Sequence, residues 1–367
     1  MVFTLRRGVA VAAAVLLALS AAACESSDDS SSSGSSSDNA KIALLLPESQ
    51  TTRYEQFDKP LFEAKVKSLC SDCTVVYNNA NQQTDTQQQQ AEAALNDGAK
   101  VLVLDPVDGE AAASIVTTAA AKKVPVISYD RLVTKADVDY YISFDNEKVG
   151  ALQATSLVEK LKKDGKTSGN IVEINGSPTD NNAKLFNKGA ESVLKTSGFT
   201  SQPSTAYFTP EWKPENAQTF MDGQISKLGK TGFVGVYAAN DGTAGGAIAA
   251  MKAAGVSPIP PVTGQDAELA AIQRIVAGDQ YMTIYKAIKP EAEKAAEIAV
   301  ALAQGKEVTG ADAKVNNGKK DVPSVLLTPV PVTKENIKTT VVADNFYTVA
   351  QICTADYQAA CKTAGLQ

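Results

Sequence analysis

The sequence predicts an α/β protein built of two doubly wound parallel-sheet domains. The chain has 367 residues, which exceeds the ~250–300 residues that a single hydrophobic core usually reaches. Short apolar runs alternate with amphipathic stretches along it, as in βα units. The runs are almost continuously apolar, which is typical of parallel strands covered by helices on both faces. With no shorter sequence period, two open sheets fit better than the alternative, a (β/α)8 barrel, which length and alternation would also allow.

The expected elements follow one another from residue 42 onward. The predicted strands are short β-branched or aliphatic runs, at 42–46, 75–77, 101–104, 126–128, 140–143, 170–174, 204–208, 233–237, 261–263 and 280–284. The predicted helices are the amphipathic stretches between them, at 53–69, 84–97, 109–122, 147–163, 181–196, 214–227, 243–254, 267–277 and 289–304.

The N-terminal residues carry the signals of export. Arg6 and Arg7 precede an apolar run, 9–19, that is too short for a permanent transmembrane helix, and small residues then lead to Cys24. We expect residues 1–24 to be a lipoprotein signal peptide with Cys24 acylated; an ordinary secretory signal is the alternative. The Ser-rich residues 25–40 predict a flexible tether. The protein is therefore expected on the outer face of the bacterial cell membrane, held by the lipidated Cys.

Composition excludes several classes of function. The chain contains no His, so it cannot build a Ser-His-Asp triad or an HExxH zinc site. Its formal net charge of −6 argues against nucleic acid as a partner. We expect no cofactor and no metal, and a monomer.

Four further cysteines would remain after export, as two close pairs: Cys70 with Cys73, and Cys353 with Cys361. An exported setting permits disulfides, and three pairings are possible. Pairing between neighbours is the simplest. A zinc site or a CxxC redox role is disfavoured, because the pairs are far apart and no thioredoxin-like pattern surrounds them.

Polar and aromatic residues follow successive predicted strands. In open parallel sheets, ligands bind beyond the carboxyl ends of the strands. Such a set supplies fixed donors and acceptors for a neutral polyol, and aromatic rings that can stack on a sugar. The candidate site residues are Arg53, Tyr54, Asp130, Arg131, Asp180, Asn182, Trp212, Asn240, Asp266 and Lys286.

The enzymatic alternative for these residues is a glycosidase with a carboxylate pair, Asp130 with Asp266 or Asp180. The neighbouring cations argue against it, because they would lower the pKa of an acid that a glycosidase needs raised. We therefore expect a binding protein and not an enzyme.

Several long stretches carry a family resemblance: SYDRLVTKADVDYYISFDNEKVGALQA (128–154), GSPTDNNAKLF (176–186), ANDGTAGGAI (239–248) and TGQDAEL (263–269). With them the chain resembles periplasmic-type sugar-binding proteins of the ribose/xylose class, the receptors of ABC importers. The resemblance implies the type I periplasmic-binding-protein fold, two lobes joined by a three-crossing hinge. Lobe one would comprise 41–144 and 287–327, and lobe two 145–286 and 328–367.

The resemblance also implies roles for the candidate residues. Arg53 would hydrogen-bond the sugar, Tyr54 would stack where the family usually has Trp, and Trp212 would be the opposing ring. The remaining polar contacts would come from Asp130 and Arg131 of lobe one and from Asp180, Asn182, Asn240, Asp266 and Lys286.

The implied function is capture of a monosaccharide by hinge closure and its delivery to the permease subunits of an ABC importer. D-xylose is the expected sugar, with glucose or another monosaccharide, and signalling instead of import, as alternatives. The segment 47–50 and the Cys-bearing tail after ~340 depart from the family pattern.

Overall fold

A computed structural model describes residues 39–366 of the chain. The first sheet contains seven strands in the order β10-β11-β5-β4-β3-β1-β2, parallel except for the antiparallel pair β10 and β11. Its strands are β1 (Lys41–Leu46), β2 (Thr74–Asn79), β3 (Ala99–Leu104), β4 (Val126–Tyr129), β5 (Tyr140–Phe144), β10 (Ala313–Asn316) and β11 (Asp321–Leu327).

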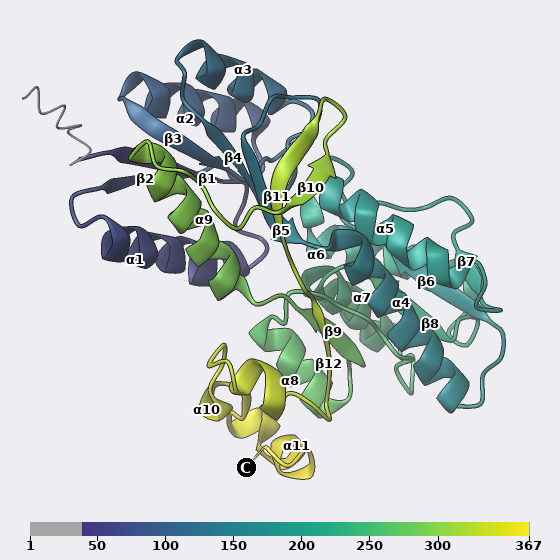
Figure 1. The fold of residues 1–367 in the computed structure, drawn as a ribbon. Helices are drawn as coiled ribbons and strands as arrows, with labels where there is room; N and C mark the ends of the chain where they lie inside the picture. Colours follow the sequence, from purple (N-terminus) through teal and green to yellow (C-terminus); the bar gives the residue numbers. More distant parts are fainter. Residues whose placement is uncertain (1–38, 367) are drawn as a thin grey trace, which may run out of the picture. The chain divides into compact units, whose positions relative to one another are not determined.

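Helices cover both faces of this sheet (Figure 1). Ile42, Leu44 and Leu46 of β1 pack in a cluster with α1 (Lys59–Leu69) and α9 (Ile288–Ala303). The alternate residues, Ala43 and Leu45, pack with α2 (Thr84–Asn96) and α3 (Ala113–Ala121). This period of two explains why the strand is apolar throughout: each face of a doubly covered parallel strand needs its own buried side chains.

The second group of elements surrounds a smaller sheet in the order β7-β6-β8, with the two-stranded pair β9 and β12 beside it. Its strands are β6 (Asn170–Ile174), β7 (Thr200–Gln202), β8 (Gly235–Ala238), β9 (Met282–Tyr285) and β12 (Val330–Thr333). Its helices are α4 (Asn146–Lys163), α5 (Asn181–Leu194), α6 (Pro214–Leu228), α7 (Asp241–Ala253) and α8 (Leu269–Ala277).

The predicted fold class is confirmed: the described strands form open, mainly parallel sheets, and the barrel alternative is wrong. The chain passes between the two groups at three points, from β5 to α4, from β9 to α9 and from β11 to β12. The residue boundaries of the two lobes remain a prediction. At the predicted end of the tether, Ala40 is buried and its carbonyl accepts from Thr74 N, so the fold includes it.

Two predicted strands are wrong. The run 204–208 is largely irregular, and the pairing with β6 is made instead by β7, which ends before Pro203. Proline has no N–H to continue a ladder, which explains the early end of this edge strand. The run 261–263 contributes only an isolated bridge between Val262 and Val236. The predicted helix 53–69 also begins as a π-helical turn, Tyr54–Asp58.

The C-terminal part contains the short helices α10 (Val349–Ile352) and α11 (Gln358–Thr363), which the sequence did not reveal. Disulfides join Cys70 to Cys73 and Cys353 to Cys361, the pairing between neighbours. Within residues 39–366, no helix is long and apolar enough to cross a membrane. The predicted signal peptide, Cys24 and most of the tether lie outside the described residues.

Candidate ligand-binding site

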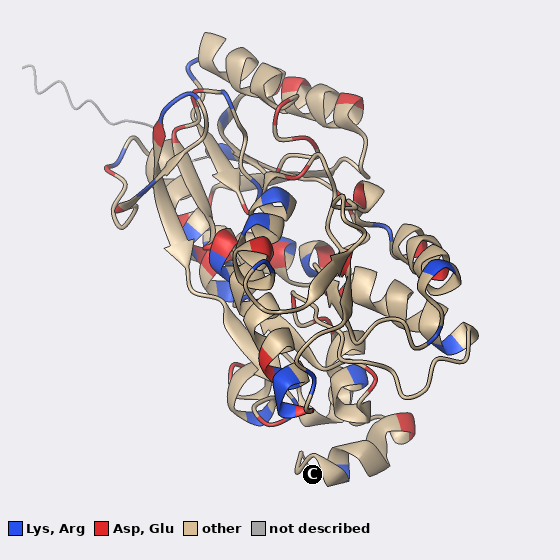
Figure 2. Cartoon of the chain, turned by 90° about the vertical axis from the view of Figure 1, so that its right-hand side faces the viewer, with Lys and Arg blue, Asp and Glu red and all other residues tan. Residues whose placement is uncertain are grey.

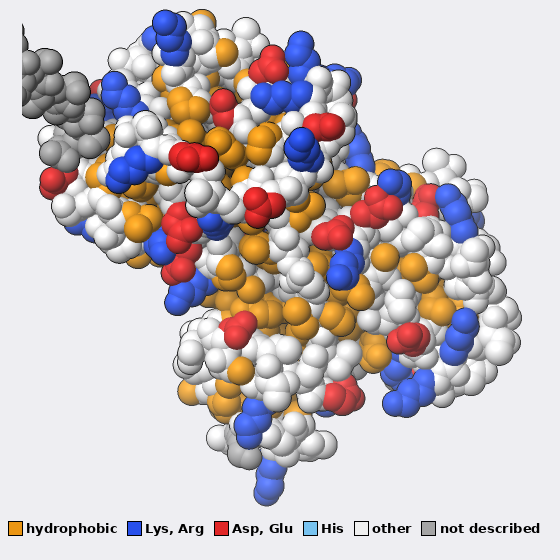
Figure 3. Space-filling model, viewed as in Figure 1, with side chains coloured by type: hydrophobic (Ala, Val, Ile, Leu, Met, Phe, Trp, Pro, Cys, Tyr) orange, Lys and Arg blue, Asp and Glu red, His pale blue; other side chains and the backbone are white. Residues whose placement is uncertain are grey.

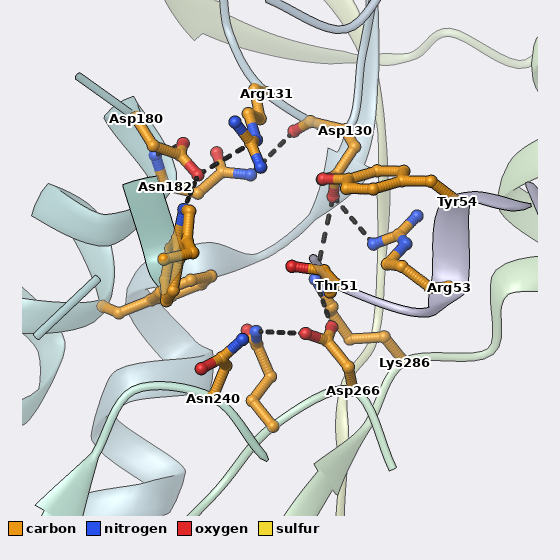
Figure 4. Close-up of a pocket in the computed structure, with 13 residues that line it drawn as sticks. Thr51, Arg53, Tyr54, Asp130, Arg131, Asp180, Asn182, Asn240, Asp266 and Lys286 are labelled. Carbon is orange, nitrogen blue, oxygen red and sulfur yellow. Dashed lines mark hydrogen bonds and ion pairs between the residues drawn. The ribbon is translucent and has the colours of Figure 1, made fainter. Parts of the chain in front are cut away.

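All ten candidate residues line one small cavity (Figure 4). Three further residues complete its lining: Thr51, Phe186 and Gln265. Its candidate residues are almost completely buried, with 2–5% of each exposed.

The topology brings these residues together at strand ends and helix starts. Asp130 directly follows β4, and Lys286 directly follows β9. Asp180 and Asn240 are the N-cap residues of α5 and α7, and their side chains accept hydrogen bonds from backbone N–H groups. Asp266 follows Gln265, which forms an isolated bridge with Ile284 of β9, and has a positive φ of 89°. Non-glycine residues in such conformations are typical of ligand sites.

Arg131 is surrounded by three carboxylates. Its Nε lies 3.1 Å from Asp180 Oδ2 and 3.6 Å from Asp105 Oδ1, and its Nη2 donates to Glu48 Oε1 at 3.2 Å. Glu48 and Asp105 belong to the first group of elements and Asp180 to the second. Arg131 therefore links the two sides of the cavity.

Arg53 is held in the same way by carboxylates of the first group. Its Nε and Nη2 donate to the two oxygens of Asp58 at 3.0 and 2.7 Å, and Nη2 also donates to Glu291 at 2.6 Å. Its Nη1 donates to Asp130 Oδ1 at 3.0 Å, and Tyr54 Oη donates to the other Asp130 oxygen at 3.1 Å. These hydrogen bonds fix the positions of the Arg53 and Tyr54 side chains, which line the cavity.

The lower part of the site in Figure 4 is built around Lys286 and Asp266. Lys286 Nζ lies 3.0 Å from Asp266 Oδ1 and 3.7 Å from Asp130 Oδ1. Gln265 Nε2 donates to Asp266 Oδ2 at 3.1 Å. Asn182 reaches across from α5, where its Nδ2 donates to the Asp130 carbonyl at 2.9 Å.

Trp212 forms an apolar wall of the cavity. Its Nε1 donates to Asp180 Oδ2 at 3.1 Å, and its ring meets Phe186 edge-on with centroids 6.4 Å apart. The ring lies directly against Gly176, where an added Cβ would come within 1.9 Å of the indole. A glycine is therefore needed at this position for the observed ring placement.

The carboxylates of the site differ in pKa. Burial alone would raise the pKa of Asp130, but Arg53, Lys286 and Arg131 together hold it well below the ordinary value. At Asp180 burial outweighs the attraction of Arg131, so its pKa is raised. The expected net lowering of the pKa is thus found at Asp130 and not at Asp180, where Arg131 lowers the pKa but burial raises it more.

The arrangement offers both donors and acceptors to a neutral ligand. Arg131 Nη1 and Gln265 Oε1 are buried and form no hydrogen bond with the described residues. Among residues 39–366 there is no group of three or more metal-ligating side chains. The chemistry of the lining, ionised and amide groups together with aromatic rings, suits a small molecule with several hydroxyl groups.

Sequence reasoning missed the buried acids behind the two arginines. Asp105 follows β3 and obeys the strand-end rule, so it could have been found. Glu48 lies in the segment noted as departing from the family pattern. Asp58 and Glu291 lie on helical segments and look like ordinary surface acids in the sequence, although both are buried.

Two doubly wound halves with a buried polar cavity between them define the class of two-lobed binding proteins. The model of the periplasmic binding protein domain matches residues 42–307. The D-xylose-binding periplasmic protein of Escherichia coli (strain K12) is 42% identical over 314 residues, which cover 85% of this chain and 92% of that protein. The multiple sugar-binding periplasmic receptor ChvE of Rhizobium radiobacter is 38% identical over 284 residues, covering 72% and 80%.

A solved structure also places the chain among solute-binding proteins. The ABC transporter solute-binding protein of Clostridium phytofermentans with bound β-D-glucose superposes with a TM-score of 0.79 at 31% identity, covering 85% of this chain and 99% of that one. The chain therefore belongs to the periplasmic binding protein family. These relatives are binding proteins, which confirms the expectation that the chain is not an enzyme.

Proposed function

We propose that this protein is an extracytoplasmic receptor that captures a monosaccharide in the cavity described above and delivers it to an ABC importer. The observation that carries the proposal is the lining itself: 13 residues that combine ionised and amide side chains with the aromatic rings of Trp212 and Tyr54. D-xylose is the proposed sugar, supported by the 42% identity with a D-xylose-binding protein.

Recognition would rest on fixed donors and acceptors. Asp266 and Asp180 can each accept from hydroxyl groups, and Arg131 and Lys286 can donate to them. Each of these groups is already held by a protein partner, so little rotamer entropy is lost when a sugar binds. A sugar that lacked one hydroxyl would leave a remaining buried donor or acceptor atom, such as Arg131 Nη1, without a hydrogen bond, at a cost of about 1–3 kcal/mol.

Delivery would depend on hinge closure. The contacts of Arg131 with Asp180 and of Asn182 with the Asp130 carbonyl join the two halves. A sugar bound between the halves adds contacts to both and so favours the closed state over the open one. The closed state is then the form that the permease subunits would recognise.

Fluorescence of Trp212, the only Trp in the chain, tests the proposal. Titration with D-xylose is expected to change the emission until it saturates. The dissociation constant should be roughly micromolar, which corresponds to a binding free energy of about −8 kcal/mol. Ribose, arabinose and glucose serve as competitors. If glucose binds more strongly than D-xylose, glucose becomes the proposed sugar, as the structural relative with bound glucose would suggest. No spectral or calorimetric change with any of the four would overturn the proposal.

The lipid anchor is part of the same proposal and rests on the sequence around Cys24. A Cys24→Ser protein is expected to leave the membrane fraction of cells that retain the wild type there. If the variant stays in that fraction, acylation at Cys24 is refuted. A gene for an ATPase and a permease next to this one would favour import, and a sensor kinase gene would favour signalling.

A further inference from the structure

The C-terminal segment, residues 334–366, packs on the part of the chain that carries Asp266 and Lys286. Val341, Tyr347 and Ile352 of this segment share an apolar cluster with α8 and with Tyr285 of β9. Gln273 Nε2 of α8 donates to the Gln351 carbonyl at 3.2 Å. In Figure 1 the yellow helices α10 and α11 accordingly lie beside α8. Figure 3, in the same view, shows hydrophobic side chains gathered on the surface just above these helices.

Phe57 is the member of this cluster that comes from elsewhere. The other members belong to residues 267–287 and 332–366, whereas Phe57 lies in the turn before α1. Its ring stacks on Phe346, with centroids 4.2 Å apart and planes inclined by 18°. Tyr347 meets Phe57 edge-on at 5.8 Å, and Phe346 also contacts Tyr285 at 5.1 Å. Phe57 thus packs against two aromatic residues of the C-terminal segment, Phe346 and Tyr347, and we call this contact the clasp.

The position of Phe57 connects this clasp to the cavity. The same π-helical turn, Tyr54–Asp58, carries Tyr54, which lines the cavity, and Asp58, which holds Arg53 with two hydrogen bonds. On the opposite side, Ala267 and Ala287 of the cluster directly follow the cavity residues Asp266 and Lys286. The clasp therefore contacts the chain next to cavity residues of both halves.

We propose that Phe57 and Phe346 are positioning residues for the ligand, and that the C-terminal segment acts through them as a latch on the closed cavity. Opening of the cavity would pull the turn with Phe57 away from the ring of Phe346. The stacked contact therefore adds to the stability of the closed form and slows ligand release. This inference rests on the proposed sugar-receptor function.

The test is the sugar affinity of a Phe346→Leu variant, measured by Trp212 fluorescence and stopped-flow release of D-xylose. An aromatic pair contributes about 0.5–1.5 kcal/mol beyond its buried area, so we expect the dissociation constant to rise about twofold to tenfold. The rise should come from a faster off-rate, because the contact acts on the closed form.

A matched control exists in the pair Tyr207 and Phe220, which stack with centroids 3.7 Å apart but do not line the cavity. Phe220→Leu should lower the unfolding temperature as Phe346→Leu does and leave the off-rate unchanged. This comparison separates positioning from general stability.

Phe57→Leu tests the same contact from the other side, and the double variant should lose little more than either single one. If the wild type binds sugar and neither Phe57→Leu nor Phe346→Leu changes the off-rate, the latch is refuted while the receptor function stands. If the wild type binds no monosaccharide, the proposed function fails and the latch with it.

Discussion

Arg131 and Asp180 face each other across the cavity, with the guanidinium Nε 3.1 Å from the carboxylate Oδ2. Both side chains are buried, and they come from elements of different sheets. On its other side, Arg131 is bound by Glu48 and lies close to Asp105. The guanidinium that lines the cavity therefore also lies against two buried acids of the first half.

Replacement of this arginine should affect binding and stability together. In Arg131→Ala we expect the sugar affinity to fall at least tenfold, which is about 1.4 kcal/mol. The unfolding free energy should also fall by about 3–5 kcal/mol, because Glu48 and Asp105 are left buried without their cation. Calorimetry with D-xylose and urea unfolding measure the two effects. Wild-type values in both would contradict the assignment.

Gly176 gives a prediction about the placement of Trp212. In Gly176→Ala the new methyl group would overlap the indole, so the ring must move and the sugar affinity should fall about tenfold or more. Gly223→Ala is the control, since a Cβ there meets nothing within 4 Å. Trp212 emission in the absence of sugar should shift only in Gly176→Ala. Equal sugar affinities of the two variants would refute the role of the ring.

The strand-end rule located the cavity because parallel strands end at one edge of a sheet, and polar residues after them meet there. It found Asp130 and Lys286 in this way. It could not find Glu291, which lies in the first turn of α9 and meets Arg53 from 238 positions along the chain. Such a contact depends on how α9 packs on the first sheet, and no local pattern encodes it.

The fold could be predicted where hydrophobic period and capping agree, as at α4 or α5. It could not be predicted at β7, where Pro203 ends the ladder, or in the C-terminal segment, whose short helices have little periodicity. Figure 2 shows Asp and Glu interspersed with Lys and Arg along the elements in that view. The clasp on Phe57 likewise depends on tertiary packing alone.

Stability should depend on pH through Glu291. Burial, together with Asp130 and Asp58, raises the pKa of Glu291 from 4.5 to about 8, although Arg53 acts in the opposite direction. Between these values the folded state binds a proton that the unfolded state has released. The contribution of Glu291 is therefore fully present below about pH 4.5 and is lost as the pH rises through about 8.

The Glu291→Gln variant isolates this contribution. Its unfolding free energy should fall less than that of the wild type between pH 5 and pH 8, since Gln does not titrate. Urea unfolding at several pH values gives the slope, and Glu293→Gln on the same helix, where the side chain is partly exposed, is the control. Parallel curves for wild type and Glu291→Gln would show that this carboxyl keeps its charge.

The two disulfides should differ in importance. Cys361 is completely buried in the cluster around α8, and its bond to Cys353 joins α10 to α11. The double variant Cys353→Ser/Cys361→Ser should lose about 2–4 kcal/mol of unfolding free energy, while Cys70→Ser/Cys73→Ser, which opens a shorter loop, should lose less. Thermal unfolding compares them, and the reverse order would contradict the prediction.

The structure of crystals grown with D-xylose tests most directly the central claim, that the cavity binds a monosaccharide. We expect electron density for one sugar in the cavity, beside Trp212 and within hydrogen-bonding distance of Arg131, Asp266 and Lys286. Sugar density at another place, or an empty cavity in crystals soaked at saturating D-xylose and D-glucose, would contradict the account.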